Sequence, residues 1–336
     1  MEASFHSDDL FPFTATRPLA EIRIGILTLR EKWQMLFPEL TSQEINEGPF
    51  GLPVNVLPTR VLAEKIRERE DWRQTAFFLE HPWDIFRLNA IALADDFALL
   101  TRGRVSQPLP SFVQAFSPEN IFIEEGARLF PCILNASQGP IYIGKQTEIM
   151  EGCLIRGAFA ACEGAVVKMG TKIYGATTVG PYSVVGGEVK NSILFGYSNK
   201  GHDGYLGDAV IGEWCNLGAG TSNSNLKNNA GEVMVWDQRS GKLLSAGVKC
   251  GLLMGDYSRC AINTSFNTGT VVGVCCNIFG EGLTPKFIPS FSWGHRGSSK
   301  YELEKSLRDI ANWKRLKNQQ LTDVEIRNLH AIFEKS

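Results

Sequence analysis

A six-residue repeat in the middle of the chain limits the folds that it can adopt. From residue 143 to residue 185, an aliphatic or small residue returns at every sixth position. An α-helix does not produce this pattern, because its apolar face repeats every three or four residues. Hairpins do not produce it either, since no turn pair such as Asn-Gly separates equal strands. The repeating residues are Ile143, Ile149, Ile155, Ala161, Val167, Ile173, Val179 and Val185.

The same interval returns on both sides of this run, and it indicates a prism of stacked coils. Three hexads, roughly 18 residues, make one triangular coil, and successive coils stack about 4.8 Å apart, like neighbouring strands. The sequence therefore predicts a mainly β fold, a left-handed parallel β-helix over residues 119–282, with the hexad residues inside. We also expect Cys153, Cys162, Cys215 and Cys276 to be inward fillers. The further hexad residues are Ile123, Leu129, Ile211, Leu217, Met254, Cys260, Phe266, Val272 and Ile278.

The segments that flank the predicted prism have other patterns. Residues 1–110 combine helical patterns at 26–37 and 60–69 with extended pieces at 52–57 and 75–79, which predicts an α/β region. Residues 107–110 have the composition of a linker. Residues 300–317 predict a helix, and Thr322 and Glu325 predict a capping box that opens a second one. We therefore expect three parts: 1–110, an α/β region; 111–294, the β-helix; and 295–336, a helical tail.

Charge and cysteine content exclude several classes of protein. The chain has 34 Lys and Arg against 36 Asp and Glu, a formal charge of −2, which gives no general attraction to nucleic acid or anionic lipid. The first residues are acidic and lack the form of a secretion signal, and no apolar stretch is long enough to span a bilayer. The eight cysteines contain no C-x-x-C pair, which disfavours a zinc site. We expect a soluble cytoplasmic protein with reduced thiols and with neither nucleic-acid nor membrane partners.

The repeat is interrupted after Val185, and the interrupted stretch resembles a known family. It reads GGEVKNSILFGYSNKGHDGYLGDAVIG over 186–212 and GAGTSNSNLKNN over 218–229. These segments resemble the acetyltransferase domain of the bifunctional N-acetylglucosamine-1-phosphate uridylyltransferase/glucosamine-1-phosphate N-acetyltransferase. The motifs TRPLAEIRIGILTLREKW at 16–33 and KFIPSFSWG at 286–294 resemble an alternative bacterial branch of that enzyme, described as a sugar nucleotidyltransferase. The resemblance implies that 1–110 is a shortened nucleotidyltransferase-like region.

The resemblance also implies a catalytic pair. His202 matches the general base of the family, and Glu188 matches the acidic residue that orients this base. Such a base suits the reaction, because an ammonium must lose a proton before its nitrogen attacks a thioester, and imidazole titrates near neutral pH. The resemblance therefore implies an N-acetyltransferase that takes acetyl-CoA and an amino-sugar 1-phosphate such as glucosamine 1-phosphate.

Other matched positions are implied to bind the substrates. The backbone amide of Ala219, in the G-A-G-T turn, is expected to hold the thioester oxygen of acetyl-CoA as it becomes an oxyanion. By resemblance, the partners are a sugar phosphate or nucleotide sugar, and the assembly is a homotrimer with active sites between subunits. The substrate-binding residues implied are Lys190, Tyr205, Asn216, Asn225 and Lys227.

Two other functions remain open from the sequence. One is nucleotidyl transfer to a sugar 1-phosphate, as in a UDP-N-acetylglucosamine diphosphorylase, although no L-x-x-G-x-G-T-R loop is present to cradle the nucleotide. Mg²⁺ is expected only with that activity, and Asp84, Asp95 and Asp96 are the carboxylates suited to it. The other is a non-enzymatic hexapeptide-repeat scaffold. The set Glu188, Lys190, His202 and Tyr205 favours acetyl transfer over both.

Overall fold

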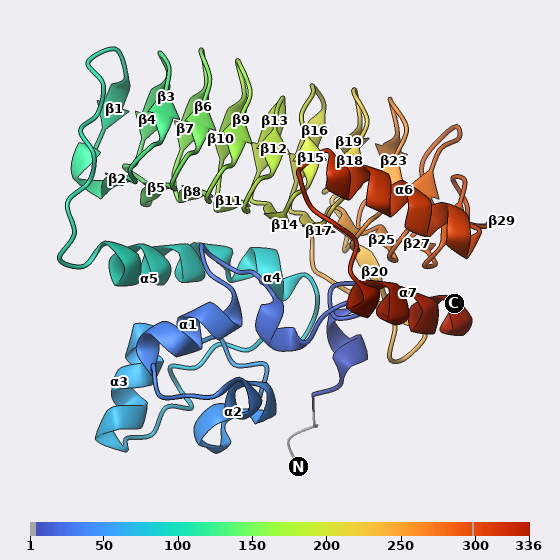
Figure 1. The fold of residues 1–336 in the computed structure, drawn as a ribbon, viewed down its shortest axis with the longest axis horizontal. Helices are drawn as coiled ribbons and strands as arrows, with labels where there is room; N and C mark the ends of the chain where they lie inside the picture. Colours follow the sequence, from blue (N-terminus) through green and yellow to red (C-terminus); the bar gives the residue numbers. More distant parts are fainter. Residues whose placement is uncertain (1–4, 298) are drawn as a thin grey trace.

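A computed structural model describes residues 5–297 and 299–336. Short parallel strands wind into a long triangular prism along the top of Figure 1, with the N-terminal helices below it and two C-terminal helices across one end. The predicted fold class, a left-handed parallel β-helix with hexad repeats, is confirmed. Among the described residues, no helix is long and apolar enough to cross a membrane.

The first face of the prism is a parallel sheet of six strands. Their order along the prism is β1-β4-β7-β10-β13-β16, and the parallel pair β19 and β24 continues the face. The strands are β1 (Gln114–Phe116), β4 (Ile133–Asn135), β7 (Leu154–Arg156), β10 (Lys172–Tyr174), β13 (Glu188–Lys190), β16 (Tyr205–Gly207), β19 (Ser222–Asn223) and β24 (Ser265–Phe266).

The second and third faces are formed in the same way. The second contains β2 (Ile121–Ile123), β5 (Ile141–Ile143), β8 (Phe159–Ala161), β11 (Thr177–Val179), β14 (Ile193–Gly196), β17 (Val210–Glu213), β22 (Leu253–Met254), β25 (Val271–Val272) and β27 (Phe287–Ile288). The third contains β3 (Arg128–Leu129), β6 (Glu148–Ile149), β9 (Val166–Val167), β12 (Val184–Val185), β15 (Asn199–Lys200), β18 (Asn216–Leu217), β23 (Arg259–Cys260), β26 (Asn277–Ile278) and β28 (Ser292–Trp293), to which β29 (Ser299–Lys300) adds antiparallel.

The hexad residues fill the prism as the sequence predicts. All eight residues of the central run, and those of the flanking runs, are buried in one continuous apolar core. Cys153, Cys215 and Cys276 belong to this core, but the prediction for Cys162 is wrong. Cys162 follows the inward-facing Ala161, and because successive side chains of a strand point to opposite faces, it packs outside the prism against the N-terminal region.

The interruptions of the repeat have two structural origins. Between Val185 and Ile211 the prism continues, but some coils have shorter sides, and the inward positions are Val189, Leu194, Lys200 and Leu206. After β19 the chain leaves the prism and forms an antiparallel hairpin of β20 (Met234–Asp237) and β21 (Lys242–Ser245) before it returns at β22.

The N-terminal region covers part of the second face with helices. They are α1 (Leu29–Leu36), α2 (Ser42–Glu47), α3 (Arg60–Glu68), α4 (Asp84–Arg87) and α5 (Asn89–Thr101), with 3₁₀ turns η1 (Ser7–Leu10), η2 (Leu19–Glu21) and η3 (Pro49–Gly51), while η4 (Pro118–Asn120) precedes β2. Of the α/β prediction, the helical patterns are confirmed. The extended pieces meet only in one antiparallel bridge, Val56–Phe78. Among the described residues before β1, no β-strand forms.

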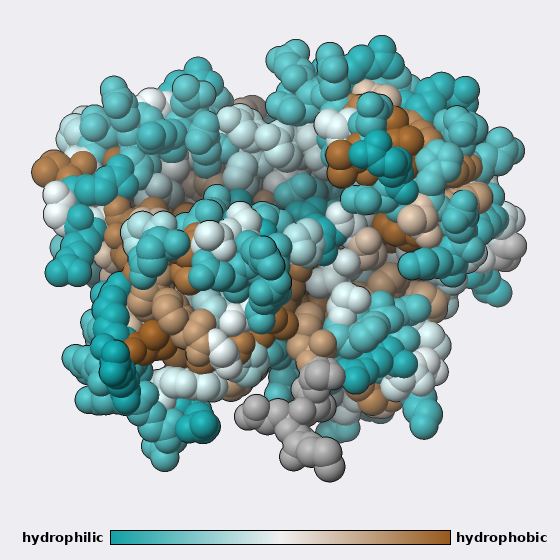
Figure 2. All heavy atoms as spheres, turned by 60° about the horizontal axis from the view of Figure 1, so that its bottom comes forward, coloured by the Kyte–Doolittle hydropathy of each residue, from teal (hydrophilic) through white to brown (hydrophobic). Residues whose placement is uncertain are grey.

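The TRPLAEIRIG motif attaches this region to the prism. The guanidinium of Arg17 forms an ion pair with the buried Asp256 and another, at 2.9 Å, with Glu213. Arg23 Nε donates to the carbonyl oxygen of Phe195 at 3.1 Å. Figure 2 shows this side of the molecule, where apolar side chains lie in the seams between polar surfaces.

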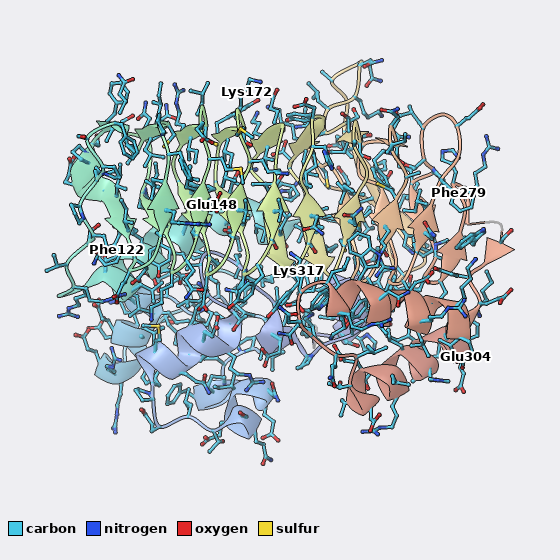
Figure 3. The ribbon with its side chains drawn as sticks, turned by 45° about the horizontal axis from the view of Figure 1, so that its top comes forward. Phe122, Glu148, Lys172, Phe279, Glu304 and Lys317 are labelled. Carbon is cyan, nitrogen blue, oxygen red and sulfur yellow. The ribbon has the colours of Figure 1, made fainter. Side chains whose placement is uncertain are left out.

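The C-terminal tail covers part of the third face. Its helices are α6 (Leu303–Arg315) and α7 (Asp323–Lys335), and the predicted capping box of Thr322 and Glu325 is present. The ring of Trp313 on α6 lies over the guanidinium of Arg259, 5.3 Å from ring centre to Cζ. In Figure 3, α6 and Lys317 lie before the prism, whereas Lys172 marks the first face at the upper edge, where no helix covers it. The first face is therefore the one that both helical regions leave open.

Candidate active site

The residues matched by the family motifs fall into two neighbouring groups. Glu188, Lys190, Tyr205 and Asn225 gather on the open first face. His202, Asn216 and Ala219 line a groove at the adjacent corner, where the chain turns from the third face to the first.

The first-face group is built on adjacent strands. Glu188 on β13 lies in register with Tyr205 on β16, and on the other side Lys190 pairs with Tyr174 of β10. The hydroxyl of Tyr174 donates to Glu188 Oε1 at 2.6 Å, and this hydrogen bond, together with burial, raises the pKa of Tyr174 to about 12. Lys190 Nζ lies 5.7 Å from the centre of the Tyr174 ring. A carboxylate and an ammonium are thus held side by side over one tyrosine.

Asn225 links this group to a buried carboxylate. Its Nδ2 donates to Tyr205 Oη at 3.1 Å and to Asp208 Oδ2 at 2.5 Å, while Asn191 Nδ2 donates to Asp208 Oδ1 at 2.7 Å. Burial, with a further contribution from the negative charge of Asp208, raises the pKa of Tyr205. The backbone of both Asn191 and Asp208 is left-handed, with φ of 46° and 47°.

Sequence reasoning missed Tyr174, Asn191 and Asp208 as members of this group. Asp208 ends the G-H-x-x-Y-L-G-D motif, and Asn191 directly follows E-V-K, so the motifs themselves could have identified both residues. Tyr174 lies one coil earlier, at an ordinary repeat position, and only the register of β10 with β13 brings it beside Glu188 and Lys190.

The corner groove has a volume of about 390 Å³. It lies where the turn at 201–204 stacks on the turn at 218–220, an arrangement fixed by the hydrogen bond from Gly220 N to Asp203 O at 3.1 Å. The imidazole of His202 is exposed there. The residues that line it include Lys168, Asn199, His202, Asn216, Ala219 and Ile262.

The G-A-G-T turn offers one backbone donor to this groove. Gly218 N donates to Cys260 O at 3.2 Å, and Gly220 N is used as described above. The carbonyl oxygen of Ala219 accepts from Asn263 N at 2.7 Å, but its own N–H has no acceptor within the described part of the chain. The amide of Ala219 is therefore available to a bound oxyanion.

Two expected associations do not form within this chain. Across the described residues, no hydrogen bond joins Glu188 to His202, and the Glu188 carboxylate accepts from Tyr174 instead. Lys227 lies in the segment that leaves the prism, where its Nζ donates to the carbonyl oxygen of Glu232 at 3.3 Å. This hydrogen bond holds the Lys227 side chain within the segment that leaves the prism.

The carboxylates considered for Mg²⁺ are engaged elsewhere. Asp84 Oδ2 accepts the amides of Glu80 and His81, at 3.1 and 2.8 Å. Asp95 Oδ1 accepts from Arg60 Nε at 3.1 Å.

The carboxylate of Asp96 is also bonded to other groups of the protein. It forms a fully buried ion pair with Lys32, and one of its oxygens accepts the amides of Ile26 and Leu27. Within the ranges 5–297 and 299–336, no cluster of three or more His, Cys, Asp or Glu suits a metal ion. These residues do not fit a magnesium site.

Comparisons with known proteins agree with the resemblance found in the sequence. Residues 2–47 match the family model described as sugar nucleotidyl transferase. The bifunctional protein GlmU of Methanocaldococcus jannaschii is 36% identical over 103 residues, 31% of this chain and 25% of that protein. The bifunctional sugar-1-phosphate nucleotidylyltransferase/acetyltransferase of Sulfurisphaera tokodaii is 38% identical over 93 residues, 27% of this chain and 23% of that protein.

A solved structure, that of Francisella novicida UDP-N-acetylglucosamine acyltransferase, covers 66% of this chain and 86% of its own at 12% identity, with a TM-score of 0.34. The matched stretch spans about a quarter of the length of each of these two curated relatives. The resemblance is thereby confirmed: the chain carries the N-terminal match of the sugar nucleotidyl transferase family together with a stretch similar to bifunctional GlmU proteins.

Proposed function

We propose that this protein is an acetyl-CoA-dependent N-acetyltransferase that acts on an amino-sugar 1-phosphate, such as glucosamine 1-phosphate. The observation that carries the proposal is the arrangement of the site. A polar cluster that includes the ammonium of Lys190 stands on the open first face, and it adjoins a groove that contains the exposed imidazole of His202 and the backbone amide of Ala219. Within residues 5–297 and 299–336, neither that ammonium nor that amide has a hydrogen-bond acceptor. Acetyl transfer needs these three elements: a phosphate anchor, a base and an oxyanion donor.

His202 is the general base of the proposed reaction. It takes a proton from the sugar ammonium, and the freed amine attacks the thioester carbonyl of acetyl-CoA. The tetrahedral intermediate then expels CoA as a thiolate, and the nitrogen gives up its second proton to that sulfur, which leaves the amide and CoA as the thiol. Glu188, held by the Tyr174 hydroxyl, supplies the negative charge that orients the base once the substrate lies between the two groups.

The sugar 1-phosphate lies on the first face in this proposal. Lys190 pairs with the phosphate, while Tyr205 and Asn225, already joined to each other, contact the sugar. Acetyl-CoA occupies the corner groove, where Asn216 contacts it and the Ala219 amide receives the thioester oxygen. Lys227 is tied to its own segment, so we assign it the outer edge of the site.

Assembly and location belong to the same proposal. The first face carries the polar cluster and is left open by both helical regions, so a second copy can approach it and enclose the site. We therefore propose a homotrimer, in the cytoplasm, with an active site at each contact between prisms.

Two assays run side by side test this function. Release of free CoA from acetyl-CoA is measured with glucosamine 1-phosphate, and release of pyrophosphate is measured with UTP and N-acetylglucosamine 1-phosphate. The proposal expects CoA release that depends on the amino sugar. If neither product forms with any amino sugar or sugar phosphate, a non-enzymatic scaffold becomes the better account.

Nucleotidyl transfer is the second candidate, because the N-terminal family match is to sugar nucleotidyl transferases. The side chains of that segment support it poorly. Arg17 is paired with Asp256 and Glu213, and Lys32 with Asp96, which leaves neither cation for a triphosphate. Pyrophosphate release without CoA release would place this candidate first.

A further inference from the structure

A lysine occupies an inward position of the third face, in a column whose other members have apolar side chains or a thiol. The inward column of the third face reads Leu129, Ile149, Val167, Val185, Lys200, Leu217, Cys260 and Ile278. Lys200 is in register with Val185, and only 1% of its surface is exposed. The side chain of Lys200 is therefore buried inside the prism.

The ammonium of Lys200 is bonded to backbone oxygens. Within the described parts of the chain, no carboxylate forms an ion pair with Lys200. Its Nζ donates instead to two backbone carbonyl oxygens, that of Gly186 at 3.1 Å and that of His202. Burying a charge costs free energy, so burial lowers the pKa of Lys200 to about 8 against the opposing effect of the nearby Asp203.

The bond to His202 matters because little else holds that residue. The neighbouring carbonyls are anchored to adjacent coils: Asp203 O accepts from Gly220 N at 3.1 Å, and Gly204 O accepts from Glu188 N at 3.2 Å. Among the described residues, the hydrogen bond from Lys200 is the only one that His202 forms. The flanking Gly201 and Gly204 give this turn little stiffness of their own.

We infer that Lys200 is a positioning residue that fixes His202 from inside the prism through the His202 carbonyl oxygen. The ammonium also binds the Gly186 carbonyl of the preceding coil, so it joins the His202 turn to the turn beneath it. A base displaced by 1 Å can lose about a hundredfold in rate, so such an anchor affects catalysis without touching substrate. This inference rests on the proposed function for its kinetic consequence, but not for its structural one.

The test replaces Lys200 with methionine, which restores the apolar column with a side chain of similar length. We expect Lys200→Met to lower kcat for CoA release at least tenfold, with KM for the sugar phosphate changed less than threefold. Ile278→Met is the matched control, because it places the same side chain in the same column away from the His202 turn, and we expect it to keep kcat within twofold. Lys200→Leu serves as a second apolar variant if the methionine variant does not fold.

A double-mutant cycle separates positioning from general support of the fold. If Lys200 acts through His202, then adding Lys200→Met to His202→Ala changes kcat less than twofold. A full tenfold loss in the His202→Ala background would overturn the inference, because Lys200 would then act by another route.

Crystal structures of the wild type and Lys200→Met supply a readout that does not need activity. We expect the His202 carbonyl and ring to move or lose order in the variant, and an unchanged His202 would refute the anchor. If the wild type transfers no acetyl group but His202 still shifts, the proposed function fails while the anchor stands.

Discussion

His202 is the residue on which the proposed chemistry depends. Replacing it with alanine removes the base but leaves the Lys190 and Tyr205 contacts, so we expect kcat to fall by about 10²–10⁴-fold with little change in substrate affinity. Steady-state CoA release, with KM measured for the sugar phosphate, tests both, and full activity of His202→Ala would contradict the assignment.

Lys190 should behave in the opposite way. The phosphate contact exists in the ground state and the transition state alike, so Lys190→Ala is expected to raise KM for the sugar phosphate at least tenfold and to change kcat less. Arg156→Ala on β7, which lies two strands from β13 on the same exposed face, is the control and should leave both constants near wild type. A loss confined to kcat would place Lys190 in the chemistry instead.

Lys200 predicts a pH dependence of stability. Its pKa is about 8 in the folded protein and near the ordinary 10.5 when unfolded, so between these values the unfolded chain binds more protons. The free energy of unfolding should therefore rise with pH over this window, by on the order of 3 kcal/mol from this group. Comparing denaturant unfolding of the wild type and Lys200→Met from pH 7.5 to 10.5 isolates the contribution of Lys200 to the free energy of unfolding, since Asp203 and Cys260 are common to both proteins.

At the scale of one element, each short strand depends on the inward residue that it contributes. Ile173 on β10 is 1% exposed and lies in register between Ile155 and Val189 of the neighbouring coils. An aspartate there would bury an unpaired charge at a cost of several kcal/mol, about the whole stability of many domains. We expect Ile173→Asp to show no cooperative thermal unfolding transition when it is followed by circular dichroism. The outward Lys172→Asp should unfold at a temperature close to that of the wild type.

For the whole molecule, the faces left open by the helices predict the assembly. The N-terminal region and α6 cover parts of the second and third faces, while the first face presents the polar cluster. Light scattering at micromolar concentration should give three times the chain mass of 37.2 kDa. A monomer at that concentration would remove the support for a shared active site.

The sequence by itself determined the prism, because a hexad repeat places one side chain per strand in the core, and burying apolar side chains favours that register alone. It also led to the proposed site, since glycine-bracketed motifs interrupt the repeat at His202 and Ala219. It could not locate Tyr174 or Lys200, whose roles depend on which coil stacks on which.

Only the tertiary structure decided how charged residues are used. Asp96 is a candidate Mg²⁺ ligand in the linear sequence, yet folding of the N-terminal region buries it beside Lys32. Docking of that region on the prism likewise pairs Arg17 with the buried Asp256. A buried charge is stable only with a partner, and the partners here lie 64 and 239 residues away along the chain. Local patterns carry the repeat and its interruptions, whereas pairings across such distances arise only when the coils are stacked and the helices are docked.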